Sequence, residues 1–281
     1  MSTSTVSDAE IGRMESVANG KAQWDEATLG KIVDANEQAV EMMVRGASMP
    51  YCEWGVDREN GWTGNASMIM PARSLARLNA LTAHRLAARG DSKGATRHLL
   101  AGIRFTRDLA QNTPLINALV ARAILPYDLN SAVVLFQSGR ITAADKASLV
   151  KVVRALPPDV FDWSRTVYVE MDGIRNGQAL LKKSSDPKKL IADLGKDPNL
   201  YGSDPRPTEK DLLEFDSTMR EAVRVFAMPS AQAEDGIRLL NARVQKLSPI
   251  TRDALRWFDT AHKARKEVEE LRSAFLKKAS S

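Results

Sequence analysis

The residue types that carry covalent chemistry are few in this chain. Cys52 is its only cysteine, so an internal disulfide and a multi-cysteine zinc cluster are excluded. A nucleophilic thiol needs a lowered pKa and a nearby base, and no histidine lies next to Cys52 in the sequence. A buried, unreactive thiol is the usual state of a lone cysteine, and we expect that state here.

The three histidines do not have the spacing of a metal site. His84, His98 and His262 are too far apart to form a helical metal-binding pair, and no His-Glu-x-x-His motif is present. A glycine-rich phosphate loop and a Gly-x-Ser-x-Gly elbow are also missing from the sequence. We therefore expect no metal, no cofactor and no catalytic residue.

A pair of carboxylates at Glu170 and Asp172 could in principle support general acid–base hydrolysis. On a helix, however, two residues at this spacing point to different faces. Arg165 and Arg175 lie close by in the sequence. We expect ion pairs on a solvated surface, Asp172 with Arg175 and Arg165 with Glu170.

The segment 48–66 concentrates aromatic and charged side chains between two predicted helices. It contains Tyr51, Trp54, Asp57 and Trp62. Aromatic faces bind ligand surfaces or the anchoring side chain of a partner, and a carboxylate can orient a polar group. These four residues are the candidates for a binding site. The composition favours the other interpretation, that Trp54 and Trp62 are core residues that close the end of a helical stack.

The charge distribution bears on the kind of partner. A net charge of +5 would suit an anionic partner, but the 40 basic and 35 acidic residues are mostly intermingled. Lys182, Lys183, Lys188 and Lys189 cluster without the aromatic platform that nucleic-acid binding would need. We expect a protein or peptide partner, which could be a second copy of the chain, rather than nucleic acid.

The elements that must position these residues are helices. Hydrophobic residues make up 43% of the chain and aromatic residues 6%, and alternating β-branched runs are missing. No stretch approaches the roughly 20 apolar residues of a membrane-spanning helix, so we expect no membrane span. Residues 1–10 are polar and lack the features of a secretory leader. A cytoplasmic protein, or an exported one whose leader is absent from this sequence, fits equally well.

The clearest local pattern predicts a helical hairpin after Pro71. Leucines at helical spacing form one stripe and alanines form a second, so this helix can contact two neighbours. Gly90 can adopt the left-handed conformation that ends a helix, and Asp91 can cap the next one. The sequence Arg89-Gly90-Asp91 is therefore expected to be the corner between two antiparallel helices.

Further helices are predicted on both sides of this hairpin. Thr113 is expected to cap a third helix with Pro114 at its first position, and Pro126 is expected to kink or end that helix. Thr142 is expected to cap the next one. The other helices are expected at about 29–44, 160–183, 212–226, 237–247 and 249–277, which makes about ten in all.

Between residues 184 and 207 the chain is rich in Pro, Gly and Asp, which indicates a long connection. Its apolar residues could dock on the body as one short helix. We expect this connection to divide an N-terminal helical array, 1–183, from C-terminal helices, 208–281. The C-terminal helices should pack on the array as one continuous structural unit.

The span from 71 to 125, with small residues where helices cross and a Gly-Asp corner, resembles a tetratricopeptide-type (TPR-like) array of helical hairpins. The 34-residue signature of such arrays is not repeated. In addition, the sequences at 52–57, 71–77 and 114–116 resemble a group of uncharacterised all-helical bacterial proteins that carry a Cys-x-Trp-Gly-x-Asp segment. The resemblance implies an all-helical fold and importance for residues 51–57, and it implies no catalytic residue.

Together these patterns predict an all-α protein, either a TPR-like array of stacked antiparallel hairpins or an irregular bundle. We expect a non-catalytic interaction module whose groove binds a peptide or protein. The alternative is a small-ligand-binding protein or a hydrolase with a pocket near residues 48–66 and 184–207. A deep cleft with convergent polar groups would favour the alternative, and an open apolar groove would favour the module.

Overall fold

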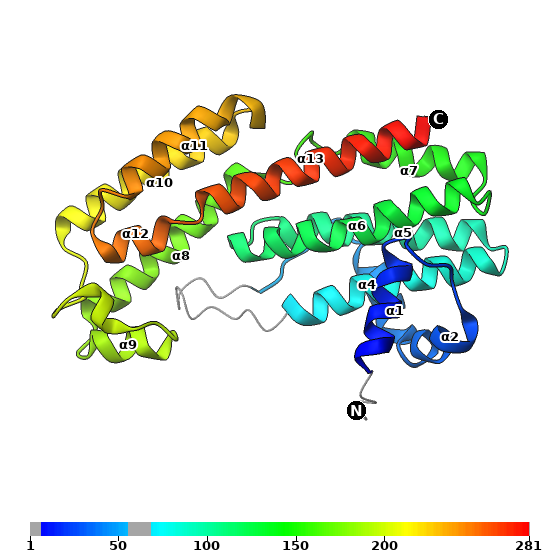
Figure 1. Cartoon of the computed structure of the whole chain (residues 1–281), viewed down its shortest axis with the longest axis horizontal. Helices are drawn as coiled ribbons and strands as arrows, with labels where there is room; N and C mark the ends of the chain where they lie inside the picture. Colours follow the sequence, from blue (N-terminus) through cyan, green and yellow to red (C-terminus); the bar gives the residue numbers. More distant parts are fainter. Residues whose placement is uncertain (1–6, 56–68, 281) are drawn as a thin grey trace.

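The computed structural model describes residues 7–55 and 69–280, and within these ranges the chain is helical and contains no strand (Figure 1). The predicted all-α fold is confirmed. The first group of helices comprises α1 (Asp8–Ala18), α2 (Glu26–Ala35), α3 (Glu37–Gly46), α4 (Ile69–Ala88), α5 (Ser92–Ala110), α6 (Leu115–Gln137) and α7 (Ala143–Ala155). The second comprises α8 (Trp163–Lys183), α9 (Pro187–Asp193), the short 3₁₀ helix η2 (Pro198–Tyr201), α10 (Glu209–Ala227), α11 (Ser230–Val244), α12 (Pro249–Leu255) and α13 (Phe258–Ser280).

The two groups lie side by side along the length of the molecule, and α13 connects them. This helix starts beside α12, runs back along α6 and reaches α7 (Figure 1). The ring of Phe275 on α13 packs on Phe136 of α6, with centroids 5.9 Å apart. One continuous apolar core therefore includes residues from α3 to α8 and from α10, α11 and α13.

The predicted hairpin is present as α4 and α5. Gly90 has a φ of +84°, and the Asp91 carboxylate accepts a hydrogen bond from the Gly94 amide at 2.8 Å. The alanine stripe of α4, including Ala76, Ala80 and Ala83, is fully buried. Small side chains let α4 pack closely on both α5 and α6.

The start of α6 differs from the prediction, because Thr113 is not its cap. The Thr113 hydroxyl donates to the Leu109 carbonyl at 2.8 Å, and Pro114 occupies the capping position. The free amide of Leu115 instead donates to Glu170 Oε2 on α8, at 2.9 Å. A carboxylate from another helix thus satisfies the donor that a local cap would otherwise satisfy.

Helix α6 continues through Pro126 to Gln137, so the proline does not end it. It is the one described helix whose length and composition would suit a membrane span. In this fold, 56% of its most apolar window is buried, and α4, α5, α8 and α13 pack around it. Packing against these four helices accounts for the apolar character of α6.

Two helices predicted as continuous are each divided. The segment 29–44 forms α2 and α3, because Asn36 ends α2 and its side-chain amide donates to the Ile32 carbonyl at 2.8 Å. The segment 249–277 forms α12 and α13, with a break near Trp257. Helix α8 begins at Trp163, later than predicted, because Val160 has a φ of +66° and cannot be helical.

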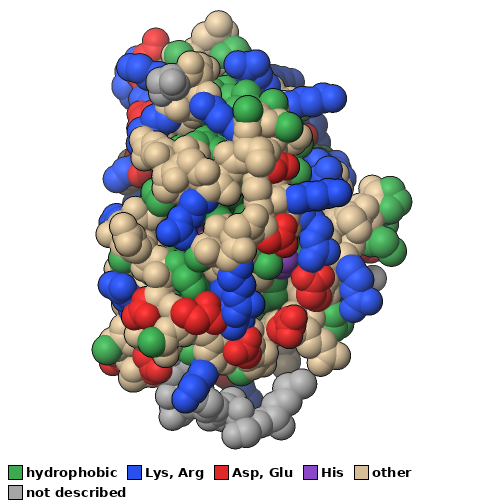
Figure 2. All heavy atoms as spheres, turned by 90° about the vertical axis from the view of Figure 1, so that its right-hand side faces the viewer, with side chains coloured by type: hydrophobic (Ala, Val, Ile, Leu, Met, Phe, Trp, Pro, Cys, Tyr) green, Lys and Arg blue, Asp and Glu red, His purple; other side chains and the backbone are tan. Residues whose placement is uncertain are grey.

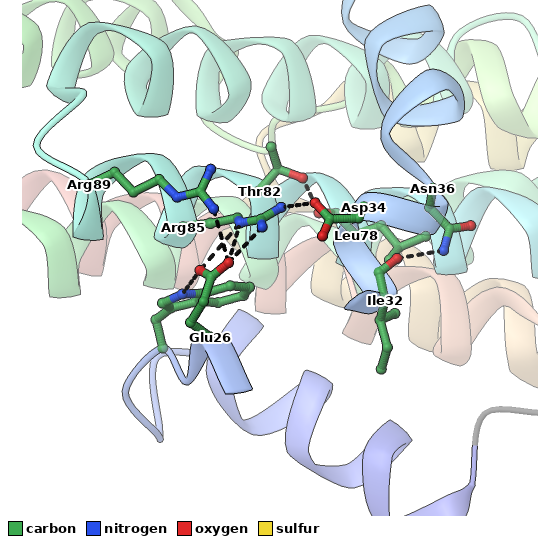
Figure 3. Close-up of polar contacts among 9 residues, drawn as sticks. Glu26, Ile32, Asp34, Asn36, Leu78, Thr82, Arg85 and Arg89 are labelled. Carbon is green, nitrogen blue, oxygen red and sulfur yellow. Dashed lines mark hydrogen bonds and ion pairs between the residues drawn. The ribbon is translucent and has the colours of Figure 1, made fainter. Parts of the chain in front are cut away.

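Helix α2 is held on α4 by an exposed polar network (Figure 3). The Arg85 guanidinium lies between Glu26 and Asp34, and Arg89 also contacts Glu26 at 2.9 Å. The hydrogen bond from Arg85 lowers the pKa of Glu26. The Arg85 side chain is only 11% exposed and bridges two carboxylates of α2, so this network fixes the orientation of α2 on α4.

A close contact within the first group joins α5 to α6. Gly102 on α5 faces Asp128 on α6, and a Cβ atom built on Gly102 would lie 2.1 Å from Asp128 Oδ1. Asp128 is completely buried. A side chain at position 102 would therefore force the two helices apart or expel the carboxyl group.

We predict that Gly102→Ala lowers the free energy of unfolding by about 1–3 kcal/mol, the usual effect of overpacking. Gly173→Ala is the matched control, because its Cβ would meet nothing within 4 Å and should stabilise helix α8 by about 0.5–1 kcal/mol. Chemical denaturation of both variants measures the difference. Equal stability changes in the two variants would contradict this prediction, because they would show that the contact between Gly102 and Asp128 does not limit how closely α5 packs on α6.

Candidate functional site

Two of the four predicted binding residues, Asp57 and Trp62, lie outside the described residues. Tyr51 is 73% exposed, and its hydroxyl lies 3.4 Å from Glu53 Oε2. Trp54 is half-buried: its indole N–H donates to the Asp108 carbonyl at 2.8 Å, and its ring meets Phe105 edge-on at 5.6 Å. These contacts anchor Trp54 on α5, whereas Tyr51 faces outwards. Their binding role stays a prediction.

Cys52 is exposed, so the expectation of a buried thiol was wrong. The chain leaves the helical layer after α3 and turns inwards only at Trp54. Partial burial of the thiol, together with the negative charge of Asp108, raises the pKa of Cys52. A raised pKa keeps the thiol protonated at neutral pH, which argues against a nucleophile.

The paired carboxylates on α8 have separate structural roles. Asp172 contacts Arg175 at 3.2 Å, as predicted. Glu170 does not pair with Arg165, because its carboxylate points to the start of α6, and burial raises its pKa. Arg165 instead donates to Asn112 at 2.8 Å. The two carboxylates therefore do not converge on one reacting group.

The histidines lie in structural surroundings. His84 Nε2 lies 2.9 Å from the Ser131 hydroxyl, and burial, with Arg140 nearby, lowers the pKa of His84 to about 4. The ring of His262 is almost fully buried on α13, and burial lowers its pKa as well. No group of three or more His, Cys, Asp or Glu side chains within 7–55 and 69–280 could hold a metal ion.

A series of polar side chains, each in contact with the next, leads from the surface of α3 into the core. His98 Nε2 lies 3.3 Å from Glu41 Oε1, and His98 Nδ1 lies 2.9 Å from Asn79 Oδ1. The Asn79 amide donates to Asp128 Oδ1 at 3.4 Å. Burial raises the pKa of Asp128 well above its ordinary value, although this hydrogen bond opposes the shift. The protonated form of Asp128 is therefore favoured, since a buried anion would lack compensation.

Next to these polar side chains, an open groove of about 640 Å³ lies between α3, α5 and α7. Its apolar wall consists of Val44, Ala47, Leu100 and Ala101, while Asp91, Asp145 and several small polar residues line one end. Four cations also line the groove: Arg45, Lys93, Arg97 and Arg104.

Helical periodicity explains why these residues converge. Positions 93, 97, 100, 101 and 104 recur at intervals of three and four and share one face of α5. This spacing is visible in the sequence, but the sequence does not show which elements lie beside this face of α5. Only the packing of α3 and α7 beside α5 turns that polar face into a groove.

The cations of this groove differ in how far they are neutralised. Arg97 contacts Glu41 at 2.7 Å. Arg45 and Arg104 are exposed, and neither side chain has a hydrogen bond or ion pair to any other described residue. Figure 2 shows Lys and Arg side chains lying among Asp and Glu side chains on the end of the molecule that faces the viewer. Within the described residues, Arg97 is thus neutralised by a carboxylate, whereas Arg45 and Arg104 are not.

A second cavity, of about 210 Å³, lies in the second helical group, away from this groove, between α9, η2 and α12. The sequence predicts, as an alternative, a pocket near residues 48–66 and 184–207. The 184–207 segment does form one wall, with Ile191, Lys196 and Tyr201. The other wall comes from α12, and no described residue of the 48–66 segment lines this cavity.

The anchoring of Trp54 yields a stability prediction. Trp54→Ala should lower the free energy of unfolding by about 2 kcal/mol or more, because it removes both the Phe105 contact and the bond to Asp108. Tyr51→Ala, a change at an exposed aromatic residue of the same segment, should stay within about 0.5 kcal/mol of wild type. Urea denaturation compares them, and a Tyr51 effect as large as that of Trp54 would contradict this assignment.

The raised pKa of Asp128 predicts a pH-dependent stability. The contribution of the protonated Asp128 carboxyl to the free energy of unfolding is fully present below the unfolded-state pKa of about 3.9. It is lost as pH rises towards the folded-state pKa of Asp128. Asp128→Asn removes this titration, so the variant should gain stability relative to wild type between pH 4 and pH 8. Denaturation at both pH values measures the change. The exposed Asp235→Asn serves as the control and should follow wild type; the same behaviour for Asp128→Asn would refute the prediction.

Comparison of the chain with protein-family models, with curated proteins and with solved structures finds no match. The resemblances to TPR-like arrays and to helical bacterial proteins therefore remain predictions. The candidate sites described above are the groove between α3, α5 and α7 and the cavity between α9, η2 and α12.

Proposed function

We propose that this chain is a non-catalytic, TPR-like interaction module that binds an acidic peptide segment of a partner protein in the groove between α3, α5 and α7. The observation that carries the proposal is the pairing of an apolar wall with cations that the described chain leaves uncompensated, above all Arg45 and Arg104. Carboxylates complement such cations, and apolar side chains complement the wall.

The dimensions of the groove suit a peptide. Lys93 and Arg104 mark the ends of the lining stripe on α5, and at 1.5 Å per residue they are roughly 16 Å apart along the helix axis. This length accommodates about five residues of an extended chain at roughly 3.3 Å per residue. A peptide with one or two apolar residues flanked by Asp or Glu could place the apolar residues on the apolar wall and the carboxylates on the cations.

The composition of the groove favours a peptide over nucleic acid. Among the described residues, no aromatic side chain lines it as a platform for base stacking, and Asp91 and Asp145 would repel a continuous phosphate backbone. Ser48, which lines the groove, is followed within three residues by Tyr51. An exposed tyrosine at this place would contact a peptide that extends past the groove, which gives the predicted binding residue a role.

The proposal predicts an acidic preference that depends on two arginines. Random-peptide display on the purified chain should enrich sequences rich in Asp and Glu with apolar residues between them. Arg45→Glu with Arg104→Glu should weaken binding of an enriched peptide at least about tenfold, or about 1.4 kcal/mol, and added salt should weaken wild-type binding. Fluorescence anisotropy of the labelled peptide measures both effects.

The matched control carries the same change of charge elsewhere. Lys183→Glu with Lys189→Glu alters two exposed lysines near α9, outside the groove, and should leave peptide affinity within about twofold of wild type. Equal weakening by both double variants would show non-specific attraction. That result, or enrichment of peptides without an acidic excess, would overturn the proposal.

A further inference from the structure

The cavity between α9, η2 and α12 combines apolar walls with a compact polar cluster. Ile191, Leu194 and Ile250 provide apolar surface, and Ala254 leaves room between them. The segment that carries the first two is tied back to α8, because the Arg206 guanidinium donates to the Ser184 carbonyl at 2.9 Å. This bond closes the 184–206 segment, which forms one wall of the cavity.

The polar cluster is organised around Asp253 on α12. One of its carboxylate oxygens accepts hydrogen bonds from the Tyr201 hydroxyl, at 2.9 Å, and from the Lys196 ammonium. The other oxygen accepts from Arg256 at 3.1 Å. Two cations and a phenol thus share one carboxylate, which leaves Asp253 with little capacity for a further donor.

The protonation states of the cluster follow from these contacts. Burial raises the pKa of Tyr201 to about 12, and the hydrogen bond to the Asp253 carboxylate adds to the shift. Burial also acts to raise the pKa of Asp253, but the hydrogen bonds from Lys196 and Tyr201 outweigh it and lower the pKa. At neutral pH Tyr201 is a neutral donor and Asp253 is ionised.

The unused hydrogen-bonding capacity in the cavity lies mainly on Lys196. An ammonium group carries three N–H donors, and among the described residues only Asp253 engages one of those of Lys196. Asp197, the other carboxylate near Tyr201, accepts from the Asn199 amide at 2.9 Å at the start of η2. A ligand that enters the cavity therefore meets donors at its polar end and needs an acceptor, preferably an anionic one.

We propose that this cavity binds a short aliphatic carboxylate, with its chain against Ile191, Leu194 and Ile250 and its carboxylate on Lys196. Arg256 can then continue to neutralise Asp253 while Lys196 pairs with the ligand. A volume of about 210 Å³ lies below the roughly 300–1,000 Å³ of sites for drug-sized ligands, which limits the ligand to a small molecule. This site is separate from the peptide groove and does not depend on it.

The test compares three probes that share a six-carbon chain and differ at the head group: sodium hexanoate, hexan-1-ol and hexylamine. Ligand-observed NMR on the full chain should show binding of hexanoate, binding at least tenfold weaker for hexan-1-ol, and no binding of hexylamine. Equal affinity for the three probes, or no binding of hexanoate, would overturn the proposal.

Two variants locate the site. Lys196→Gln keeps a hydrogen-bond donor towards Asp253 but removes the charge, and it should weaken hexanoate binding at least tenfold; Lys189→Gln, an exposed lysine of α9, should bind like wild type. Ala254→Phe fills the cavity while it leaves Lys196, Tyr201 and Asp253 in place, so it should abolish binding even if Lys196→Gln disturbs the fold. Unchanged affinity in Ala254→Phe would refute the site.

The outcome is independent of the peptide proposal. The double variant Arg45→Glu with Arg104→Glu should bind hexanoate like wild type, because its changes lie in the first helical group. Loss of hexanoate binding in that variant would place the anion in the peptide groove and so overturn the assignment to this cavity.

Discussion

The burial of the Asp128 carboxyl against Gly102 is the contact that sets the distance between α5 and α6. Because α6 also packs on α4, α8 and α13, its position determines where both helical groups sit. Burial of a polar group is costly unless hydrogen bonds compensate it, and among the described residues Asn79 donates to Asp128 Oδ1 while Asp128 Oδ2 has no partner. Asn79 also contacts His98, and His98 contacts Glu41 at the surface. Helix α3, which forms one side of the groove between α3, α5 and α7, is thereby coupled to the same core contact.

The two helical groups are joined by polar contacts at places where a helix end would otherwise be left unsatisfied. Glu170 on α8 accepts from the first free amide of α6. Arg265 on α13 is almost fully buried and contacts Asp159 at 2.7 Å, between α7 and α8. Removal of one member of such a buried pair leaves an uncompensated charge, so these contacts specify the arrangement of the groups more than they add to its stability.

Local sequence signals predicted much of the fold. The helical class, the Gly90–Asp91 corner and the Thr142 cap depend on neighbouring residues and were recognisable. The Thr113 cap was predicted wrongly because Glu170, distant in the sequence, takes over that role. The groove was not predicted, and only one wall of the cavity was, for the same reason: each is lined by helices that become neighbours only through tertiary packing.

The course of α13 has a consequence for how the chain reaches this structure during synthesis. Arg122 on α6 pairs with Glu267 on α13, so every intervening residue must leave the ribosome before that contact can form. Until then, Phe136 and the adjoining apolar surface of α6 have no α13 partner such as Phe275. A nascent chain in this state exposes surface that chaperones bind, and the time it spends there depends on the rate of translation.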